Sequence, residues 1–213
     1  MALDHSHLAP IVQPRRLWSR DEVLATPSPV PRRPGVYGWY FKDLPPDFDS
    51  QSAIVAHGCT LLYVGIAPSR PGSKTTLQSR IRLHFCATAD ESTLRRSLGC
   101  LLASRLGLEL CQVGGGRRTT FGAGEARLSD WMADHALVCW LEHSEPWLLE
   151  RQFLQQLLLL LNLQGNVRNP LHEQLTRLRR QAQDRARAST DRRATAGHDP
   201  AIVCGTTVHH DGS

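Results

Sequence analysis

The chain has 213 residues, of which 41% are apolar, and its formal net charge is +5. This length and composition predict one domain with a single sizeable core and terminal extensions. No run of about 18 consecutive apolar residues occurs, which argues against a membrane-spanning helix, and residues 1–14 lack the apolar segment of a signal peptide. We therefore expect a cytoplasmic protein whose six cysteines are reduced thiols.

Nearly all of the positive charge comes from arginine, because Lys42 and Lys74 are the only lysines. The planar guanidinium group suits bidentate contacts with phosphate. A GC-rich genome would produce the same arginine bias whatever the function of the protein. The charge therefore permits a nucleic-acid partner without requiring one.

Residues 1–34 are expected to form an N-terminal extension. Ser19 is suited to cap a short helix over residues 20–25, with Glu22 completing a capping box. The alternating prolines that follow exclude helix. The folded core is therefore expected to begin at Gly35.

Two apolar, aromatic-rich runs have the length of β-strands, at residues 36–41 and 61–66. Each places a tyrosine beside a glycine, in Gly35-Val36-Tyr37 and Tyr63-Val64-Gly65, where the backbone allows close approach to another chain or a ligand. The connection between the runs, residues 42–60, is too long for a tight hairpin turn. We therefore expect a loop there.

A helix is expected to begin at Thr75 or Thr76. Its core-facing stripe consists of apolar residues spaced four apart: Leu77, Ile81 and Phe85. Arg80 and His84 have the same spacing, so their side chains share a neighbouring face of this helix.

The next elements follow in order along the chain. Helices are expected over residues 92–106 and 124–135, and a third strand over residues 136–141. Ser144 is suited to cap a further helix that has Pro146 in its first turn.

Residues 167–183 are expected to form a basic segment that is helical from His172. Residues 184–213 have no periodicity and are expected to be a disordered tail. Arginines cluster around the junction of these segments: Arg177, Arg179, Arg180, Arg185 and Arg187. Such a cluster can grip a phosphate backbone or form a solvated helix face.

Glu150 is the most unusual residue of the helix that starts near Pro146. It lies in the same helical stripe as four apolar residues: Trp147, Leu154, Leu157 and Leu161. A carboxylate among apolar neighbours is costly unless it is paired or binds a cation. The stripe therefore indicates either a cation ligand or a glutamate at its rim, paired with a nearby arginine.

Seven residues occur in an order and spacing that resemble the GIY-YIG nuclease superfamily: Tyr37, Tyr63, Gly65, Arg80, His84, Glu150 and Asn162. The resemblance covers residues 35–166. It implies an α+β fold with a small antiparallel, three-stranded central sheet flanked by helices. A helical insertion at about 87–141 and extended N- and C-terminal segments would be added to that core.

The resemblance also implies a metal-dependent endonuclease that hydrolyses phosphodiester bonds in DNA, in repair, recombination or defence. It favours DNA over RNA as the nucleic-acid partner, and the sequence itself does not distinguish the two. One divalent cation, Mg²⁺ or Mn²⁺, would be held by Glu150 and by substrate phosphate oxygens, because a hard cation prefers oxygen ligands. Arg80 would neutralise charge on the phosphoryl oxygens in the transition state. No particular protein partner is indicated.

The same resemblance implies roles for the remaining residues. Tyr37, with Tyr63 as the second candidate, would orient a water and accept its proton if neighbouring groups lower the phenol pKa from about 10. His84 would assist proton transfer or hydrogen-bond phosphate. Asn162 would orient the substrate or a structural neighbour of Glu150.

One departure from the family pattern concerns a missing cation. Several relatives carry a lysine directly after the second tripeptide, where this chain has Ile66, so Arg70 or Lys74 would have to replace it. Nucleic-acid contacts are expected from a set of basic residues: Arg70, Lys74, Arg82, Arg177 and Arg180. Two alternatives stay open: a nucleic-acid-binding module that does not cleave, and a structural domain in which Arg80 and Glu150 simply pair.

Overall fold

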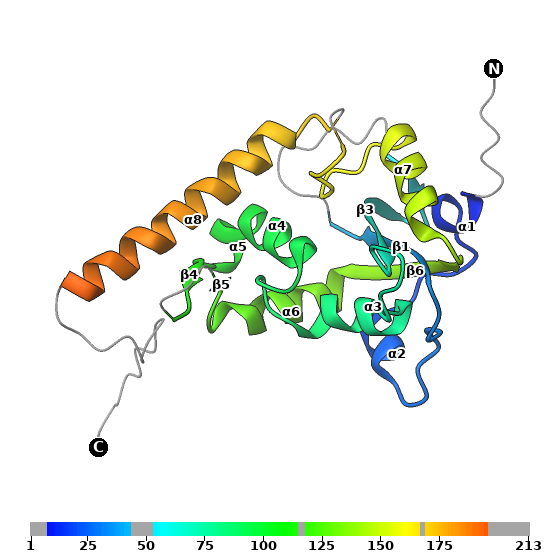
Figure 1. The fold of residues 1–213 in the computed structure, drawn as a ribbon, viewed down its shortest axis with the longest axis horizontal. Helices are drawn as coiled ribbons and strands as arrows, with labels where there is room; N and C mark the ends of the chain where they lie inside the picture. The colour runs from blue at the N-terminus through cyan, green and yellow to red at the C-terminus, as the bar shows by residue number, and fades with distance from the viewer. Residues whose placement is uncertain (1–7, 44–52, 115–117, 167–168, 196–213) are drawn as a thin grey trace.

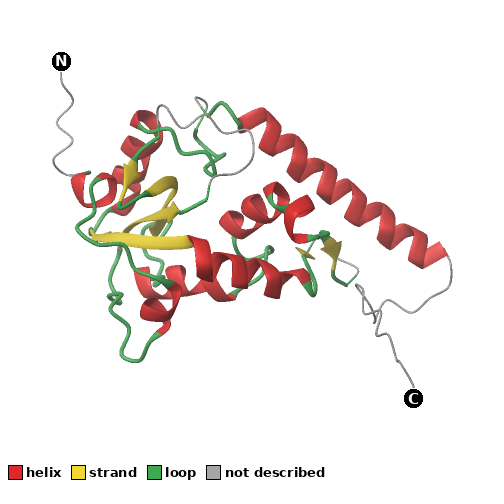
Figure 2. Ribbon diagram, turned by 180° about the vertical axis from the view of Figure 1, so that it is seen from behind, coloured by secondary structure: helices red, strands yellow, loops and turns green. Residues whose placement is uncertain are grey.

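The computed structural model describes residues 8–43, 53–114, 118–166 and 169–195 (Figure 1). A β-sheet with helices on both faces forms one part of the molecule, and the long helix α8, His172–Thr195, extends away from it. Figure 2 shows from behind that the sheet strands gather at one end and that helices surround them. Within the described residues, no helix is both long enough and apolar enough to cross a membrane.

Among the described residues, four antiparallel strands form the central sheet in the order β2-β3-β1-β6. Their bounds are Gly35–Phe41 for β1, Val55–Ala56 for β2, Cys59–Ala67 for β3 and Ala136–Glu142 for β6. The predicted α+β fold with an antiparallel sheet flanked by helices is confirmed. The short strand β2 is added to the three expected strands because His57 and Gly58, both at positive φ, turn the chain tightly into β3.

One face of the sheet packs against the helix that carries Arg80. Tyr37 and Trp39 of β1 both point to this face, because alternate residues of a strand share a side. Helix α3, Leu77–Cys86, supplies the predicted apolar stripe to the same core: Leu77, Ile81 and Phe85. The Thr76 hydroxyl caps α3 by accepting a hydrogen bond from the Ser79 N–H, which confirms where this helix begins.

The opposite face of the sheet is covered by α1, Ala9–Val12, and α7, Pro146–Gln156. Tyr40 of β1 packs there with Ile11 and Phe153. The Tyr40 hydroxyl also donates a 2.6 Å hydrogen bond to the carbonyl of Ile11. Both faces of β1 are therefore buried, and this strand forms the centre of the fold.

The segment before Gly35, which the sequence marks as an extension, is integrated into this fold. Helix α2, Arg20–Leu24, begins with the predicted capping box, in which Ser19 and Glu22 each accept the other's backbone N–H. Trp18 forms an antiparallel bridge with β6 and so continues the sheet at its edge. The N-terminal segment therefore stabilises both the sheet and the core beneath it.

Between β3 and β6 the chain forms a mostly helical region. Its elements after α3 are α4, Thr93–Leu101; α5, Ala103–Leu106; β4, Cys111–Gln112; β5, Thr119–Thr120; and α6, Gly124–His135. The helix predicted over residues 92–106 is divided into α4 and α5, and the one predicted over residues 124–135 is confirmed. The small β4–β5 ribbon was not expected from the sequence.

The predicted start of α7 is partly wrong. Pro146 does lie in the first turn, but Glu145 rather than Ser144 occupies the N-cap position, without a side-chain cap. The helix ends at Gln156, so the apolar residues after it do not continue the predicted stripe. The core-facing residues of α7 include Leu149 and Phe153 instead.

Helix α8 is longer than the sequence predicts. It continues past residue 183 to Thr195, where a disordered tail was expected, and residues 196–213 lie outside the described part of the chain. The reason is that the helix packs against α4 and β4 through a buried face: Leu175, Ala182 and Ala186. The alanines are small and helix-favouring, so they continue this face without the large apolar residues that mark a core stripe in a sequence.

Candidate active site

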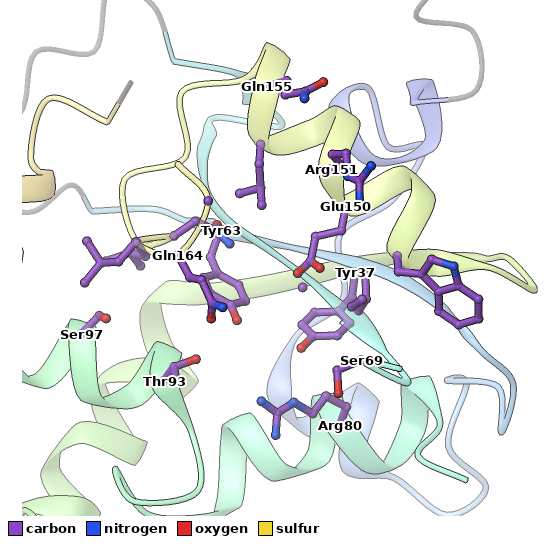
Figure 3. Close-up of a pocket in the computed structure, with 18 of the residues that line it drawn as sticks. Tyr37, Tyr63, Ser69, Arg80, Thr93, Ser97, Glu150, Arg151, Gln155 and Gln164 are labelled. Atoms are coloured by element: carbon purple, nitrogen blue, oxygen red, sulfur yellow. The ribbon is translucent and has the colours of Figure 1, made fainter. Parts of the chain in front are cut away.

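A cavity of about 910 Å³ opens beside the central sheet, lined by β1, β3, α3, α4, α7, α8 and the segment after α7 (Figure 3). All but one of the predicted catalytic residues line it: Tyr37, Tyr63, Arg80, Glu150 and Asn162. The exception, His84, is fully buried and hydrogen-bonded to Tyr37. Side chains that are far apart in the sequence therefore meet at one cavity.

The two tyrosines reach the cavity from neighbouring strands. Tyr37 pairs with Gly65, and Trp39 pairs with Tyr63, so the two tyrosines are diagonal neighbours on one face of the sheet. The Tyr37 ring occupies the space above Gly65, where a Cβ atom would overlap both the ring and its hydroxyl. The glycine is therefore required for the position of Tyr37.

A hydrogen-bonded chain leads from Tyr37 into the protein. The Tyr37 hydroxyl lies 2.8 Å from Nε2 of His84, and Nδ1 of His84 lies 2.7 Å from the hydroxyl of Ser92. Burial lowers the pKa of His84 well below its usual range, and the positive charges of Arg80 and Arg95 lower it further. His84 is therefore a neutral imidazole, with one ring nitrogen available as a hydrogen-bond acceptor.

Both tyrosines are neutral phenols. Burial raises the pKa of Tyr37 well above its usual range and also raises that of Tyr63. Arg80 acts in the opposite direction on both groups but does not outweigh burial. A tyrosine that accepts the proton of a water needs neighbouring groups to lower its pKa. In this chain the pKa of both tyrosines is raised instead.

Glu150 extends from α7 toward the side of the cavity that holds Tyr37 and Arg80 (Figure 3). Trp147 and Leu154, one turn away on either side, also line the cavity while packing against the edge of the core, so the stripe seen in the sequence lies at the boundary between the cavity and the core. Burial raises the pKa of the Glu150 carboxyl. Among the hydrogen bonds and ion pairs of the described residues, none involves Glu150, so this partly buried carboxylate has no compensating partner.

Arg80 is partly exposed and also has few partners. Its guanidinium donates one long hydrogen bond, 3.5 Å, to the carbonyl of Glu91. No ion pair joins Arg80 to Glu150 among the described residues, which removes the main support for a purely structural pairing of the two. A cation and an anion thus both face the cavity with their charges uncompensated.

Asn162 holds the strand that carries Tyr63. Its Oδ1 accepts from the Val64 N–H at 2.9 Å, and its Nδ2 donates to the Val64 carbonyl at 2.7 Å. The next backbone bond, from the Leu161 N–H to the Leu62 carbonyl, is 2.9 Å long. Because both polar atoms of its amide are occupied by backbone, Asn162 positions β3 between the tyrosine and Gly65.

These residues occur together in a known family. A family model described as the GIY-YIG catalytic domain matches residues 35–181. The chain belongs to this family. The resemblance seen in the sequence is thus confirmed, and membership indicates a nuclease-type activity on DNA. Neither the curated proteins nor the solved structures contain a match to the chain.

GIY-YIG nucleases generally use divalent cations, so the cavity should contain at least one side chain that can bind such an ion. Among the described residues, no group of three or more His, Cys, Asp or Glu side chains could enclose a metal ion. Glu150 offers a single carboxylate with free oxygens in an open cavity. This fits a hard cation that keeps several waters and takes its other ligands from substrate phosphates, as Mg²⁺ does.

The basic residues predicted to contact nucleic acid lie outside the cavity of the GIY-YIG domain. All of them are exposed, and none lines it: Arg70, Lys74, Arg82, Arg177 and Arg180. Ile66 does line the cavity and is only 6% exposed, so the position of the family lysine is apolar here. Neither Arg70 nor Lys74 takes its place, although Ser69 and Thr75 beside them reach the cavity.

Sequence reasoning did not single out several polar residues that line the cavity of the GIY-YIG domain: Thr93, Ser97, Arg151, Gln164 and Arg179. Arg179 was only one arginine of a cluster. A signal for it does exist in the sequence, because it falls between Leu175 and Ala182 on the buried face of α8. The serine and threonine of α4 carry no comparable signal.

A buried ion pair between Arg95 and Glu125 stabilises the helices next to the GIY-YIG site. Arg95 is fully buried, and its guanidinium donates to the Glu125 carboxylate at 2.8 Å and to the backbone carbonyls of His84 and Phe85. Burial acts to raise the pKa of Glu125, but hydrogen bonds, including that from the Ala89 N–H, bring it below the usual value. The pair is therefore fully satisfied and ties the end of α3 to α4 and α6.

Proposed function

We propose that this GIY-YIG domain is a divalent-cation-dependent endonuclease that hydrolyses phosphodiester bonds in DNA. The observation that carries the proposal is that Tyr37, Tyr63, Arg80 and Glu150 converge on one open cavity, where Glu150 has no partner within the described part of the chain. A structural domain would have no need to leave a partly buried carboxylate uncompensated. Together with a family that indicates nuclease-type activity, the cavity points to hydrolysis of a phosphate ester.

Glu150 would hold the cation, Mg²⁺ or Mn²⁺, at the wall formed by α7. When bound, the cation supplies Lewis-acid polarisation of the phosphate and stabilises the leaving oxygen. Arg80 lines the same cavity, so its guanidinium can donate to the phosphoryl oxygens of the substrate as negative charge develops on them.

Tyr37 is the group that would take a proton from the attacking water. As a neutral phenol it can donate its own proton to Nε2 of His84 while a lone pair of the same oxygen accepts the proton of the water. This arrangement requires the Nδ1–H of His84 to donate to Ser92. The negative phosphate of a bound substrate would offset the charge of Arg80 that lowers the His84 pKa, and so would make the imidazole a better acceptor.

Tyr63 has a different environment and is the second candidate. Its hydroxyl interacts with Thr93 and with Tyr37 rather than with the imidazole. Neither of these two hydroxyls is a base, whereas the imidazole that contacts Tyr37 is one. We assign it to orienting the water or a phosphate oxygen beside Tyr37.

The decisive experiment is a nicking assay on branched, flapped and plain DNA duplexes, and on an RNA duplex, with Mg²⁺, Mn²⁺ or a chelator. The wild type should cleave DNA only with a divalent cation, and Glu150→Ala and Glu150→Gln should lose about 10³-fold or more in rate. Glu145→Gln is the matched control, because Glu145 is exposed on the same helix and does not line the cavity. Equal cleavage by wild type and Glu150→Ala, with clean controls, would remove the assignment. The preferred substrate of the panel would distinguish repair or recombination from defence.

The buried Ile66 favours one alternative, a nucleic-acid-binding module that has lost cleavage. It leaves an apolar wall where several relatives have a cation beside the second tyrosine. Such a module would bind DNA in a salt-dependent manner without turnover. Its affinity for DNA in chelator would be the same for the wild type and for Glu150→Ala. The same panel of substrates and variants therefore separates the two functions.

A further inference from the structure

Arg179, Ser97 and Thr93 form a polar wall of the cavity on the side of Tyr63 away from Glu150. Figure 3 shows Thr93 and Ser97 on that side, while Glu150, Tyr37 and Arg80 lie on the other. We infer that this wall is a second phosphate subsite, which holds an internal phosphodiester of the substrate strand next to the one that is cleaved. The inference rests on the proposed function and adds the path of the strand through the cavity.

Arg179 differs from the other arginines of α8. It lies on the packed face of the helix, is partly buried and lines the cavity, whereas Arg180 and Arg187 are exposed and lie near Asp184. Its guanidinium donates one long hydrogen bond, 3.5 Å, to the Ser97 hydroxyl. No carboxylate forms an ion pair with Arg179 among the described residues.

The surroundings of Arg179 make an anion favourable there. Burial lowers the pKa of the Arg179 guanidinium, and the nearby positive charge of Arg96 lowers it further. A partly buried cation beside a second cation destabilises the protein unless a negative group compensates it. Within the described chain that group is lacking, so the compensation would come from a ligand.

The hydroxyls beside Arg179 suit a phosphate. Ser97 is 1% exposed and Thr93 lies one helical turn before it, so both project from the same face of α4 into the cavity. A planar guanidinium flanked by hydroxyl groups can donate to several oxygens of one phosphate at once, whereas a carbonyl group offers it only one oxygen. The cavity is continuous from Arg80 to Arg179, so one strand can place neighbouring phosphates at both ends.

The test measures DNA binding in chelator, where no cleavage occurs, by fluorescence anisotropy over a range of salt concentrations. Arg179→Met should weaken binding about tenfold at 0.1 M salt and reduce the slope of log affinity against log salt by about 1. Arg179→Lys should recover part of the affinity, and Ser97→Ala, which leaves α8 unchanged, should weaken binding about threefold. Arg105→Met is the matched control: Arg105 is an exposed arginine of α5 that pairs with Asp43 outside the cavity, so its loss should leave the slope unchanged.

Two results would overturn the inference. One is an affinity and salt slope of Arg179→Met and Ser97→Ala equal to those of the wild type, with unchanged unfolding midpoints. The other is a defect seen only on duplexes with a 5′-terminal phosphate and not on duplexes with hydroxyl ends, since that would place a terminal phosphate at Arg179. Both results leave the nuclease assignment intact, because that assignment depends on the effect of Glu150→Ala on cleavage.

Discussion

The hydroxyl of Tyr37 lies 2.8 Å from Nε2 of His84, and both side chains are almost completely buried. The bond joins the central strand of the sheet to the helix that also carries Arg80. It gives Tyr37, which lines the cavity, a proton acceptor inside the protein. The hydroxyl of Tyr63 interacts instead with Thr93 and Tyr37, which are not bases, so the contact with His84 supports the order in which the sequence ranks the two tyrosines.

We therefore expect Tyr37→Phe to reduce the cleavage rate about 10²- to 10⁴-fold, as for loss of a general base. Tyr63→Phe should have a smaller effect. Single-turnover cleavage with saturating enzyme measures both, and thermal unfolding verifies that each variant is folded. A larger loss in Tyr63→Phe than in Tyr37→Phe would exchange the roles of the two residues.

Gly65→Ala should inactivate the protein through Tyr37. A methyl group at this position overlaps the tyrosine ring, so the ring must move away from His84. We expect cleavage as low as in Tyr37→Phe, and a loss of unfolding free energy of about 1–3 kcal/mol from overpacking. Gly38→Ala is the control, because Gly38 lies on β1 and its methyl group would crowd Ile11 and Leu61 on the other face of the sheet. If Gly65→Ala cleaved like the wild type, the proposed position of the phenol in the reaction would be wrong.

His84 should make the protein sensitive to acid. Its pKa is lowered in the folded state, so below the unfolded value of about 6.5 the unfolded chain binds more protons. The stability contributed by the neutral imidazole is complete above that pH and decreases as the pH falls, by up to about 1.4 kcal/mol per pH unit. The free energy of unfolding, measured in urea at pH 5, 6, 7 and 8, should decrease less toward low pH in His84→Gln than in the wild type. Parallel curves for the two proteins would contradict the burial of a neutral histidine.

Glu150 should lower the stability of the protein when no cation is present. Because burial raises the pKa of its carboxyl, the charged form is disfavoured in the folded state at neutral pH and the difference disappears in acid. We expect Glu150→Gln to raise the unfolding midpoint at pH 7 by roughly 2 °C. Addition of millimolar Mg²⁺ or Mn²⁺ should raise the midpoint of the wild type but not of Glu150→Gln. A cation effect of equal size in both proteins would place the ion elsewhere.

Asn162→Ala should destabilise the protein and not only its activity. The substitution removes both hydrogen bonds to the Val64 backbone and leaves those buried groups without partners. The expected loss of unfolding free energy, measured in urea, is about 2–4 kcal/mol. Asn162→Asp should lose less, because its side chain can still accept the hydrogen bond from the Val64 N–H. Wild-type stability combined with lost cleavage in Asn162→Ala would instead indicate direct contact with the substrate.

Local patterns in the sequence predicted much of the fold. The length and the apolar, aromatic-rich composition of residues 36–41 and 61–66 predict strands, and the four-residue spacing of Leu77, Ile81 and Phe85 predicts the core face of α3. These features depend on neighbours in the chain, because the periodicity of a strand or helix is set by backbone geometry. The same periodicity correctly placed Arg80 and His84 on one helix, although it did not reveal that one is partly exposed and the other fully buried.

Patterns failed where a helix has two apolar faces or a face of small residues. In α7 the stripe containing Trp147 and Leu154 faces the cavity, and only the packing of Leu149 and Phe153 against the sheet decides this. In α8 the alanines that bury the helix look the same in sequence as residues of a disordered segment. For the same reason the sequence did not distinguish Arg179 from the neighbouring arginines, because the direction of its side chain depends on where α8 lies against α4.

The amino-acid sequence alone predicts which reactive groups this protein carries: its tyrosines, arginine, histidine and glutamate in the family order, on strands and helices that local sequence patterns indicate. Only the packing of these elements places the groups in one cavity, keeps the phenols neutral, and leaves Glu150 without a hydrogen-bond or ion-pair partner among the described residues. These properties depend on burial and on distances between residues far apart in the chain, and both arise only when the helices pack against the sheet.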